Sequence, residues 1–210
     1  MPSKKMLLND ARLYLILDRQ VNSYERLFEI AKRTILAGVD IIQLRDKNGS
    51  AKDILNFSKR ILKLTNHRAL YIINDRIDLA ITGRASGVHL GQDDIPVKLA
   101  RRMVGSNTLI GVSCQTLAQA RRAVEEGADY IGFGSVFKTL TKPERRPMVM
   151  KLLSEVIKNI SIPVFAIGGI DLKNTLQLKG IGVQRIAVCR AICKAKNLEC
   201  TVKSFKVAIE

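Results

Sequence analysis

Short apolar segments alternate with longer amphipathic segments along the whole chain. The apolar segments are rich in branched aliphatic residues and end at glycine or polar residues, which predicts buried strands. These lie at 13–17, 39–44, 70–73, 87–90, 109–112, 130–133, 163–167 and 185–189. The segments between them carry apolar residues at helical spacing, which predicts helices at 24–37, 50–64, 77–81, from Pro96, 117–126, 148–157, 172–178, 191–194 and 198–209.

Each predicted strand is followed by a predicted helix, and eight such units close a (β/α)8 TIM barrel, an α/β fold. An open doubly wound sheet is the alternative, but no Gly-x-Gly-x-x-Gly turn follows the strand at 13–17. No linker or block of like charges interrupts the pattern. We therefore expect a single TIM-barrel domain over 1–210, with its core at about 12–194 and a C-terminal helix at 198–209.

The composition is that of a globular protein, with 47% hydrophobic and 26% charged residues. No uncharged apolar segment is long enough to cross a membrane, and the apolar segment before Asp10 is too short for a signal peptide. We therefore expect a cytoplasmic protein without a membrane partner. The four cysteines show no paired metal-ligand spacing, which predicts reduced structural thiols.

The chain carries 35 Lys and Arg against 19 Asp and Glu, a net charge of +16. Three explanations stay open: nucleic-acid binding, attraction of phosphorylated small substrates, or a general bias of composition. The positive residues are scattered, and the chain has no Trp and 4 Tyr for base stacking, so nucleic acid is the disfavoured partner. A homo-oligomer also stays open.

In a TIM barrel, functional side chains lie at the carboxyl ends of the strands. The strand at 39–44 ends in Gln43-Leu44-Arg45-Asp46-Lys47, and strand alternation sends Gln43, Arg45 and Lys47 to one side. Two cations and an amide suit a diphosphate, although charges exposed to solvent at a strand end are the alternative.

Two acids follow neighbouring strands, Asp75 after 70–73 and Asp94 after 87–90. Paired carboxylates beside a phosphate site are typical of Mg²⁺ binding, whereas either residue alone equally suits a helix N-cap. His89 lies within a predicted strand and is expected to be a hydrogen-bonded core or rim residue. Ser113 is expected either to bind a ligand or to cap the next helix.

A second anion site is predicted at the ends of the last two strands, and a separate anion cradle in the segment 129–142. Gly168 and Gly169 allow close approach of the backbone to a phosphate at the following helix, and Arg190 adds a positive charge. Thr139, Thr141 and Lys142 after the strand at 130–133 suit an anion cradle, with an exposed loop closed by Pro143 as the alternative. The diphosphate site and the second anion site imply two phosphorylated substrates.

Six motifs in this order resemble the thiamine-phosphate synthase family over about 13–192. They are Gln-Leu-Arg-Asp-Lys (43–47), Asn-Asp-Arg (74–76), Gly-Val-His-Leu-Gly-Gln-Asp-Asp (87–94), Gly-Val-Ser (111–113), Gly-Ala-Asp-Tyr-Ile-Gly-Phe-Gly with Thr-Leu-Thr-Lys (127–142) and Ala-Ile-Gly-Gly-Ile (166–170). The family that this chain resembles joins a hydroxymethylpyrimidine diphosphate to a hydroxyethylthiazole phosphate. The products are thiamine monophosphate and pyrophosphate.

The resemblance implies a role for each matching residue. Arg45, Lys47, Lys142 and Ser113 would act in catalysis, and Asp75 and Asp94 would bind Mg²⁺. The substrate-binding set that it implies is Gln43, Leu44, Arg45, Asp46, Lys47, Asn74, Ser113, Thr139, Leu140, Thr141, Lys142, Gly169, Cys189 and Arg190.

The chain departs from the family pattern at several positions. Arg190 stands where serine is usual, Ser135 and Leu140 where proline is common, and 143–150 lacks the usual glycine. Two alternatives to the synthase follow: a thiazole tautomerase of the same superfamily, and a basic nucleic-acid-binding barrel. The complete 43–47 motif and the acid pair argue against both.

Overall fold

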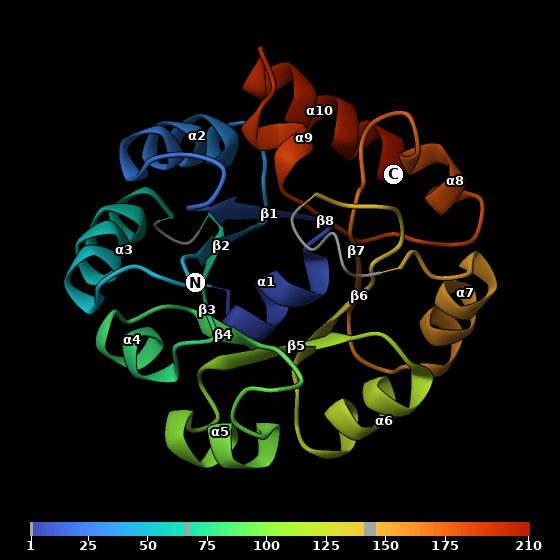
Figure 1. The fold of residues 1–210 in the computed structure, drawn as a ribbon, viewed down its shortest axis with the longest axis horizontal. Helices are drawn as coiled ribbons and strands as arrows, with labels where there is room; N and C mark the ends of the chain where they lie inside the picture. Colours follow the sequence, from blue (N-terminus) through green and yellow to red (C-terminus); the bar gives the residue numbers. More distant parts are fainter. Residues whose placement is uncertain (1, 66–67, 141–145) are drawn as a thin grey trace.

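The strands form a closed parallel barrel (Figure 1). The computed structural model describes residues 2–65, 68–140 and 146–210, and in these ranges eight strands pair in chain order, with β1 and β8 closing the ring through Leu13 and Ile186. The strands are β1 Leu13–Asp18, β2 Ile41–Arg45, β3 Leu70–Asn74, β4 Gly87–Leu90, β5 Leu109–Cys114, β6 Tyr130–Phe133, β7 Val164–Ile167 and β8 Ile186–Val188. The predicted TIM barrel is confirmed, and the open sheet is excluded.

Helices surround the ring of strands (Figure 1). They are α2 Tyr24–Leu36, α3 Ala51–Thr65, α4 Ile77–Thr82, α5 Val97–Val104, α6 Leu117–Glu125, α7 Met150–Asn159, α8 Thr175–Lys179, α9 Arg190–Cys193 and α10 Leu198–Ile209. Local capping sets several of these starts, as at Ser23, whose hydroxyl accepts from the backbone N–H of Arg26 at the start of α2. Within the described ranges, no helix is long and apolar enough to cross a membrane.

An additional helix, α1 Lys4–Asp10, begins at the N-cap Ser3 and lies across the ring (Figure 1). Its Leu8 is buried in the same apolar cluster as the inward-facing Leu70 and Leu109. The helix therefore covers the end of the barrel where the strands begin. The sequence did not predict it, because a helix this short has too few apolar positions to establish a period.

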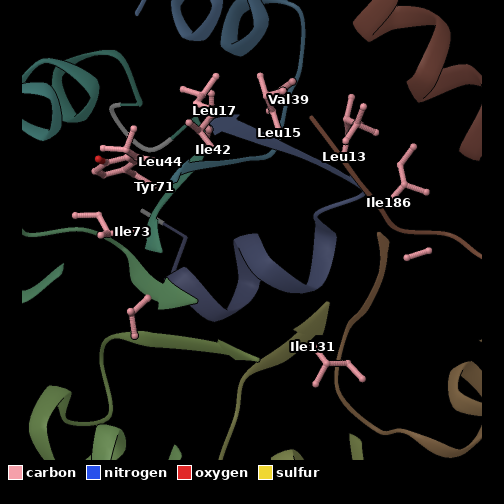
Figure 2. Packing of buried hydrophobic residues seen from close by; sticks show 14 of the residues in the cluster. Leu13, Leu15, Leu17, Val39, Ile42, Leu44, Tyr71, Ile73, Ile131 and Ile186 are labelled. Atoms are coloured by element: carbon pink, nitrogen blue, oxygen red, sulfur yellow. The ribbon is translucent and has the colours of Figure 1, made fainter. Parts of the chain in front are cut away.

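Strand alternation separates two buried layers. Leu13, Leu15 and Leu17 of β1 pack outward into the cluster that includes Leu27 of α2 (Figure 2). Tyr14 and the other even-numbered positions face the barrel interior instead. The inner layer changes from apolar to polar toward the carboxyl ends of the strands, and this change positions the site.

Some helix limits differ from prediction. The helix expected at 172–178 begins at Thr175, because the Asp171 carboxylate accepts from the backbone N–H groups of Lys173 at 2.9 Å and Asn174 at 3.0 Å and holds a turn there. The glycine pair therefore does not lead directly into a helix. The short α9 begins at Arg190, after the N-cap Cys189 that follows β8, and one residue earlier than predicted.

Candidate active site

A cavity of about 400 Å³ opens at the carboxyl ends of the strands. Its floor is aromatic, with the Tyr14 and Phe165 rings in edge contact at 5.4 Å between centroids. Its polar wall includes Gln43, Arg45, Asn74, His89, Ser113, Lys138, Thr139, Asp171, Cys189 and Arg190. The location agrees with the prediction from barrel architecture.

Arg45 is held by a residue that the sequence did not indicate. Its guanidinium donates to Asp18 Oδ2 at 2.7 Å, and the two residues face each other across β1 and β2. Asp18 is 1% exposed and Arg45 8%. Such a buried pair fixes the cation in position, because neither charge is stable there alone. The signal in the sequence was the inward alternation of Tyr14, Ile16 and Asp18.

Lys47, Asp75 and Asp94 form a charged group beyond the carboxyl ends of β2, β3 and β4. The Lys47 ammonium lies 3.3 Å from Asp75 Oδ2. Burial raises the pKa of Asp75, and the charge of Asp94 and a hydrogen bond with it add to that rise, while Lys47 opposes it. Asp94 accepts from the backbone N–H of Gly91 at 2.6 Å. Neither acid caps a helix, since α4 begins after Arg76 and α5 after Pro96.

The acid pair fits Mg²⁺ in the manner typical of phosphate-handling sites. Among the residues that the structure describes, no three His, Cys, Asp or Glu side chains gather as a complete metal cage. Mg²⁺ needs no such cage, because it commonly uses one or two carboxylates together with substrate phosphates and water. The charge of Asp94 contributes to the raised pKa of Asp75, as expected where two carboxylates lie close together, and a bound cation would favour the ionised form of both.

Gln43 and Ser113 lie at opposite ends of a buried hydrogen-bonded network. The Gln43 amide donates to the Tyr14 hydroxyl at 2.8 Å, and His89 Nε2 lies 2.9 Å from Ser113 Oγ. Ser113 does not cap α6, because Thr116 does so through a capping box with Gln119. Of the two predicted roles, helix capping is therefore excluded. His89 is the hydrogen-bonded rim residue that was predicted.

The opposite wall is formed by the loops after β6, β7 and β8. Gly169 has φ 63°, and a Cβ there would overlap the carbonyl oxygen of Lys138, so this close approach requires glycine. Arg190 lines the cavity, and its buried Nε has no hydrogen-bond partner among the described residues. A buried guanidinium N–H without a partner suits an anionic ligand.

Of the predicted site residues that the structure describes, Leu44, Asp46, Lys47, Asp75 and Asp94 are not among those that line the cavity. The Leu44 side chain is 1% exposed and packs in the outer apolar cluster, because alternation turns it away from Gln43 and Arg45. Asp46 accepts from the Tyr24 hydroxyl at 2.7 Å and from the backbone N–H of Gly49 at 2.8 Å, so it orders its own loop. These two predictions of substrate contact are corrected for the side chains. Thr141 and Lys142 lie outside the described residues.

Comparisons with known proteins agree with the motifs. The family model for thiamine monophosphate synthase matches residues 13–192. A thiamine-phosphate synthase of Prochlorococcus marinus is 44% identical over 92% of this chain and 56% of its own length, and one of Clostridium beijerinckii is 37% identical over 94% and 95%. The thiamine phosphate pyrophosphorylase structure from Pyrococcus furiosus has a TM-score of 0.87 at 32% identity, covering 98% of this chain and 96% of that one.

The chain belongs to the thiamine monophosphate synthase family. The resemblance based on six motifs is thereby confirmed. The chain spans about half the length of the Prochlorococcus relative and nearly all of the Clostridium one. The activity, substrates and partners of the whole protein therefore remain proposals, as do its single-domain organisation and its cytoplasmic location.

Proposed function

We propose that this member of the thiamine monophosphate synthase family is a transferase that makes thiamine monophosphate. It would join hydroxymethylpyrimidine diphosphate to hydroxyethylthiazole phosphate and release pyrophosphate. The observation that carries the proposal is one cavity lined by Arg45 on one side and by Gly169 and Arg190 on the other, two groups that suit anions. Two phosphorylated substrates meeting over an aromatic floor would occupy such a cavity.

The proposed roles divide along these walls. The pyrimidine diphosphate would bind Gln43, Arg45, Lys47, Asn74 and Ser113, and Asp75 and Asp94 would hold Mg²⁺. The thiazole phosphate would bind the backbone at Gly169, Thr139 and the Cys189–Arg190 segment. The resemblance adds Thr141 and Lys142, which lie outside the described residues.

The reaction requires that the negative charge on the departing pyrophosphate is neutralised and that the pyrimidine and thiazole rings are aligned. Loss of pyrophosphate leaves a pyrimidine cation, and the thiazole nitrogen then forms the new bond. No protein nucleophile is required, so the side chains act by position and charge. Arg45 is prepared for this role because Asp18 holds it in place. Mg²⁺, when bound, would supply charge neutralisation at the diphosphate oxygens.

The direct test is product formation by the purified protein. Both substrates are mixed with it, with and without Mg²⁺, and thiamine monophosphate is measured by mass spectrometry. Mg²⁺-dependent product supports the proposal. Absence of product from protein shown to be folded contradicts it. Isomerisation of a thiazole phosphate would then favour the tautomerase, and salt-sensitive binding of nucleic acid the basic barrel.

A further inference from the structure

An unbroken row of buried hydrogen bonds crosses the barrel interior. It begins at Gln43 of β2, passes through the hydroxyls of Tyr14 and Tyr130, and reaches His89 and Ser113. The Tyr14 and Tyr130 oxygens are 2.9 Å apart, and the Tyr130 oxygen lies 3.3 Å from His89 Nδ1. The row therefore joins side chains from five strands beneath the cavity.

The number of hydrogens on each group favours one direction for the row. The Gln43 amide donates to Tyr14, and either tyrosine hydroxyl could donate to the other. Donation from Tyr14 to Tyr130 uses the one hydroxyl hydrogen of Tyr14, whereas the reverse leaves that hydrogen without an acceptor in the row. Tyr130 in turn has one hydrogen, and it is directed to His89 Nδ1. A neutral His89 then carries its proton on Nε2 and donates to Ser113 Oγ. The Ser113 hydrogen remains for a group in the cavity that Ser113 lines.

Burial makes this direction stable. Tyr130 is 0% exposed, Tyr14 2% and His89 6%, so each unmade hydrogen bond would leave a polar group away from water. Burial also raises the pKa of both tyrosines, which keeps their hydroxyl hydrogens in place. Reversal of the bond between Tyr14 and Tyr130 would also reverse both bonds of His89, because Tyr130 has one hydrogen and a neutral imidazole has one.

A glycine in β5 leaves space for the Tyr130 side chain of this row. Gly111 of β5 pairs in register with Tyr130 of β6. A Cβ at Gly111 would overlap the Tyr130 ring, so the tyrosine reaches the interior only because position 111 is glycine. The Gly-Val-Ser motif thus provides space for Tyr130 as well as the hydroxyl of Ser113.

We propose that Tyr14 and Tyr130 are positioning residues that hold His89 in the Nε2–H tautomer and thereby present the Ser113 hydroxyl as a donor to the cavity. The same row turns the amide oxygen of Gln43 away from Tyr14, leaving it as an acceptor. The effect of this positioning on the pyrimidine diphosphate rests on the proposed function, whereas the tautomer of His89 does not.

The tautomer is measured on the free protein by nitrogen-15 NMR of the histidine rings at mildly alkaline pH. The chain has 2 His, so His67→Gln leaves the signals of His89 alone. We expect a protonated Nε2 and an unprotonated Nδ1. Tyr130→Phe should move the signals of both ring nitrogens toward the average of the two tautomers, and so should Tyr14→Phe, which acts on His89 through Tyr130. A protonated Nδ1 in the parent, or unchanged signals in either variant, overturns the proposal.

A matched control separates this role from simple loss of a buried hydroxyl. Tyr71 is also 0% exposed, and its hydroxyl lies 2.9 Å from Ser58 Oγ, outside the cavity. Tyr71→Phe should leave the His89 signals and the kinetics unchanged. Tyr130→Phe should lower kcat/KM for the pyrimidine diphosphate by about tenfold or more, with KM for the thiazole phosphate retained.

The two proposals fail in different ways. If the unmodified protein makes no thiamine monophosphate, the proposed function fails while the NMR result on the free protein still decides the tautomer. If it makes product and Tyr130→Phe has the kinetics of Tyr71→Phe, the positioning role fails and the proposed function stands.

Discussion

The ammonium of Lys47 lies 3.3 Å from Oδ2 of Asp75, so a predicted diphosphate ligand and a predicted metal ligand are bound to each other. Lys47 follows β2 and Asp75 follows β3, and these strands are neighbours in the barrel. The ion pair partly offsets the repulsion between Asp75 and Asp94. A cation bound by the two acids would replace Lys47 in this role and release its ammonium for a phosphate oxygen.

Asp75→Asn should abolish Mg²⁺-dependent turnover, lowering kcat at least about a hundredfold, because one of two carboxylates is lost. The fold should persist, since Asp75 has φ 60° and asparagine tolerates this conformation. Steady-state kinetics across Mg²⁺ concentrations and thermal unfolding are the measurements. Asp78→Asn, at an exposed acid on α4 paired with Arg76, is the control. Unchanged turnover in Asp75→Asn would remove Asp75 from the site.

Arg45→Met should lower both activity and stability. It leaves Asp18 as a buried charge without its cation, which costs about 3–5 kcal/mol in the free energy of unfolding. Adding Asp18→Asn should restore most of that stability but none of the turnover, since the cation is still missing. Urea unfolding and product formation measure the two effects. Recovery of turnover in the double variant would show that Arg45 serves only to compensate Asp18.

The four cysteines should differ strongly in alkylation rate. Cys200 is exposed and Cys189 half-buried. Burial raises the pKa of Cys114 to about 12, and the hydrogen bond of the Cys193 thiol to Cys189, together with burial, raises the pKa of Cys193. Because thiolates are the reactive form, Cys200 and then Cys189 should react, and the other two only after unfolding. Tryptic cleavage after Arg190 separates Cys189 from Cys193 for mass spectrometry.

The same labelling reports on the proposed phosphate wall. Cys189 lines the cavity, so thiamine monophosphate or the thiazole phosphate should slow its alkylation by about tenfold. Cys200, on α10, should react at the same rate with or without ligand. Equal rates at Cys189 under saturating ligand would place the thiazole phosphate elsewhere.

The ion pair between α2 and α10 should make stability depend on pH. A hydrogen bond from Arg33 lowers the pKa of Glu199 from 4.5 to about 2. The native state therefore favours the ionised form of Glu199. Its contribution to the free energy of unfolding is complete above pH 4.5 and disappears as the pH falls toward about 2. Glu199→Gln should be less stable than the parent at neutral pH and equal to it near pH 2.

Urea unfolding midpoints over a pH series measure this convergence. Glu155→Gln is the control, because Glu155 is exposed on α7 and forms no ion pair with the described residues. A difference between Glu199→Gln and the parent that stays constant down to pH 2 contradicts the assignment.

The alternation of apolar segments predicted the barrel because strand and helix periods are local properties of the chain. The apolar period did not predict the limit of a helix where a side chain orders the preceding turn, as Asp171 does before α8. The motifs predicted the site at the carboxyl ends of strands. They did not separate Gln43 and Arg45, which line the cavity, from Asp46, which orders its own loop.

The sequence by itself determined the fold class, the family and the edge of the barrel where the chemistry lies, because these follow from periodicity and from residues close together in the chain. The tertiary structure decided which distant side chains meet. Asp18 binds Arg45, and Tyr14 joins Tyr130 across 116 positions of sequence, because strand register and the close approach at Gly111 bring them together. Such contacts depend on the closure of the whole barrel, and no local pattern encodes them.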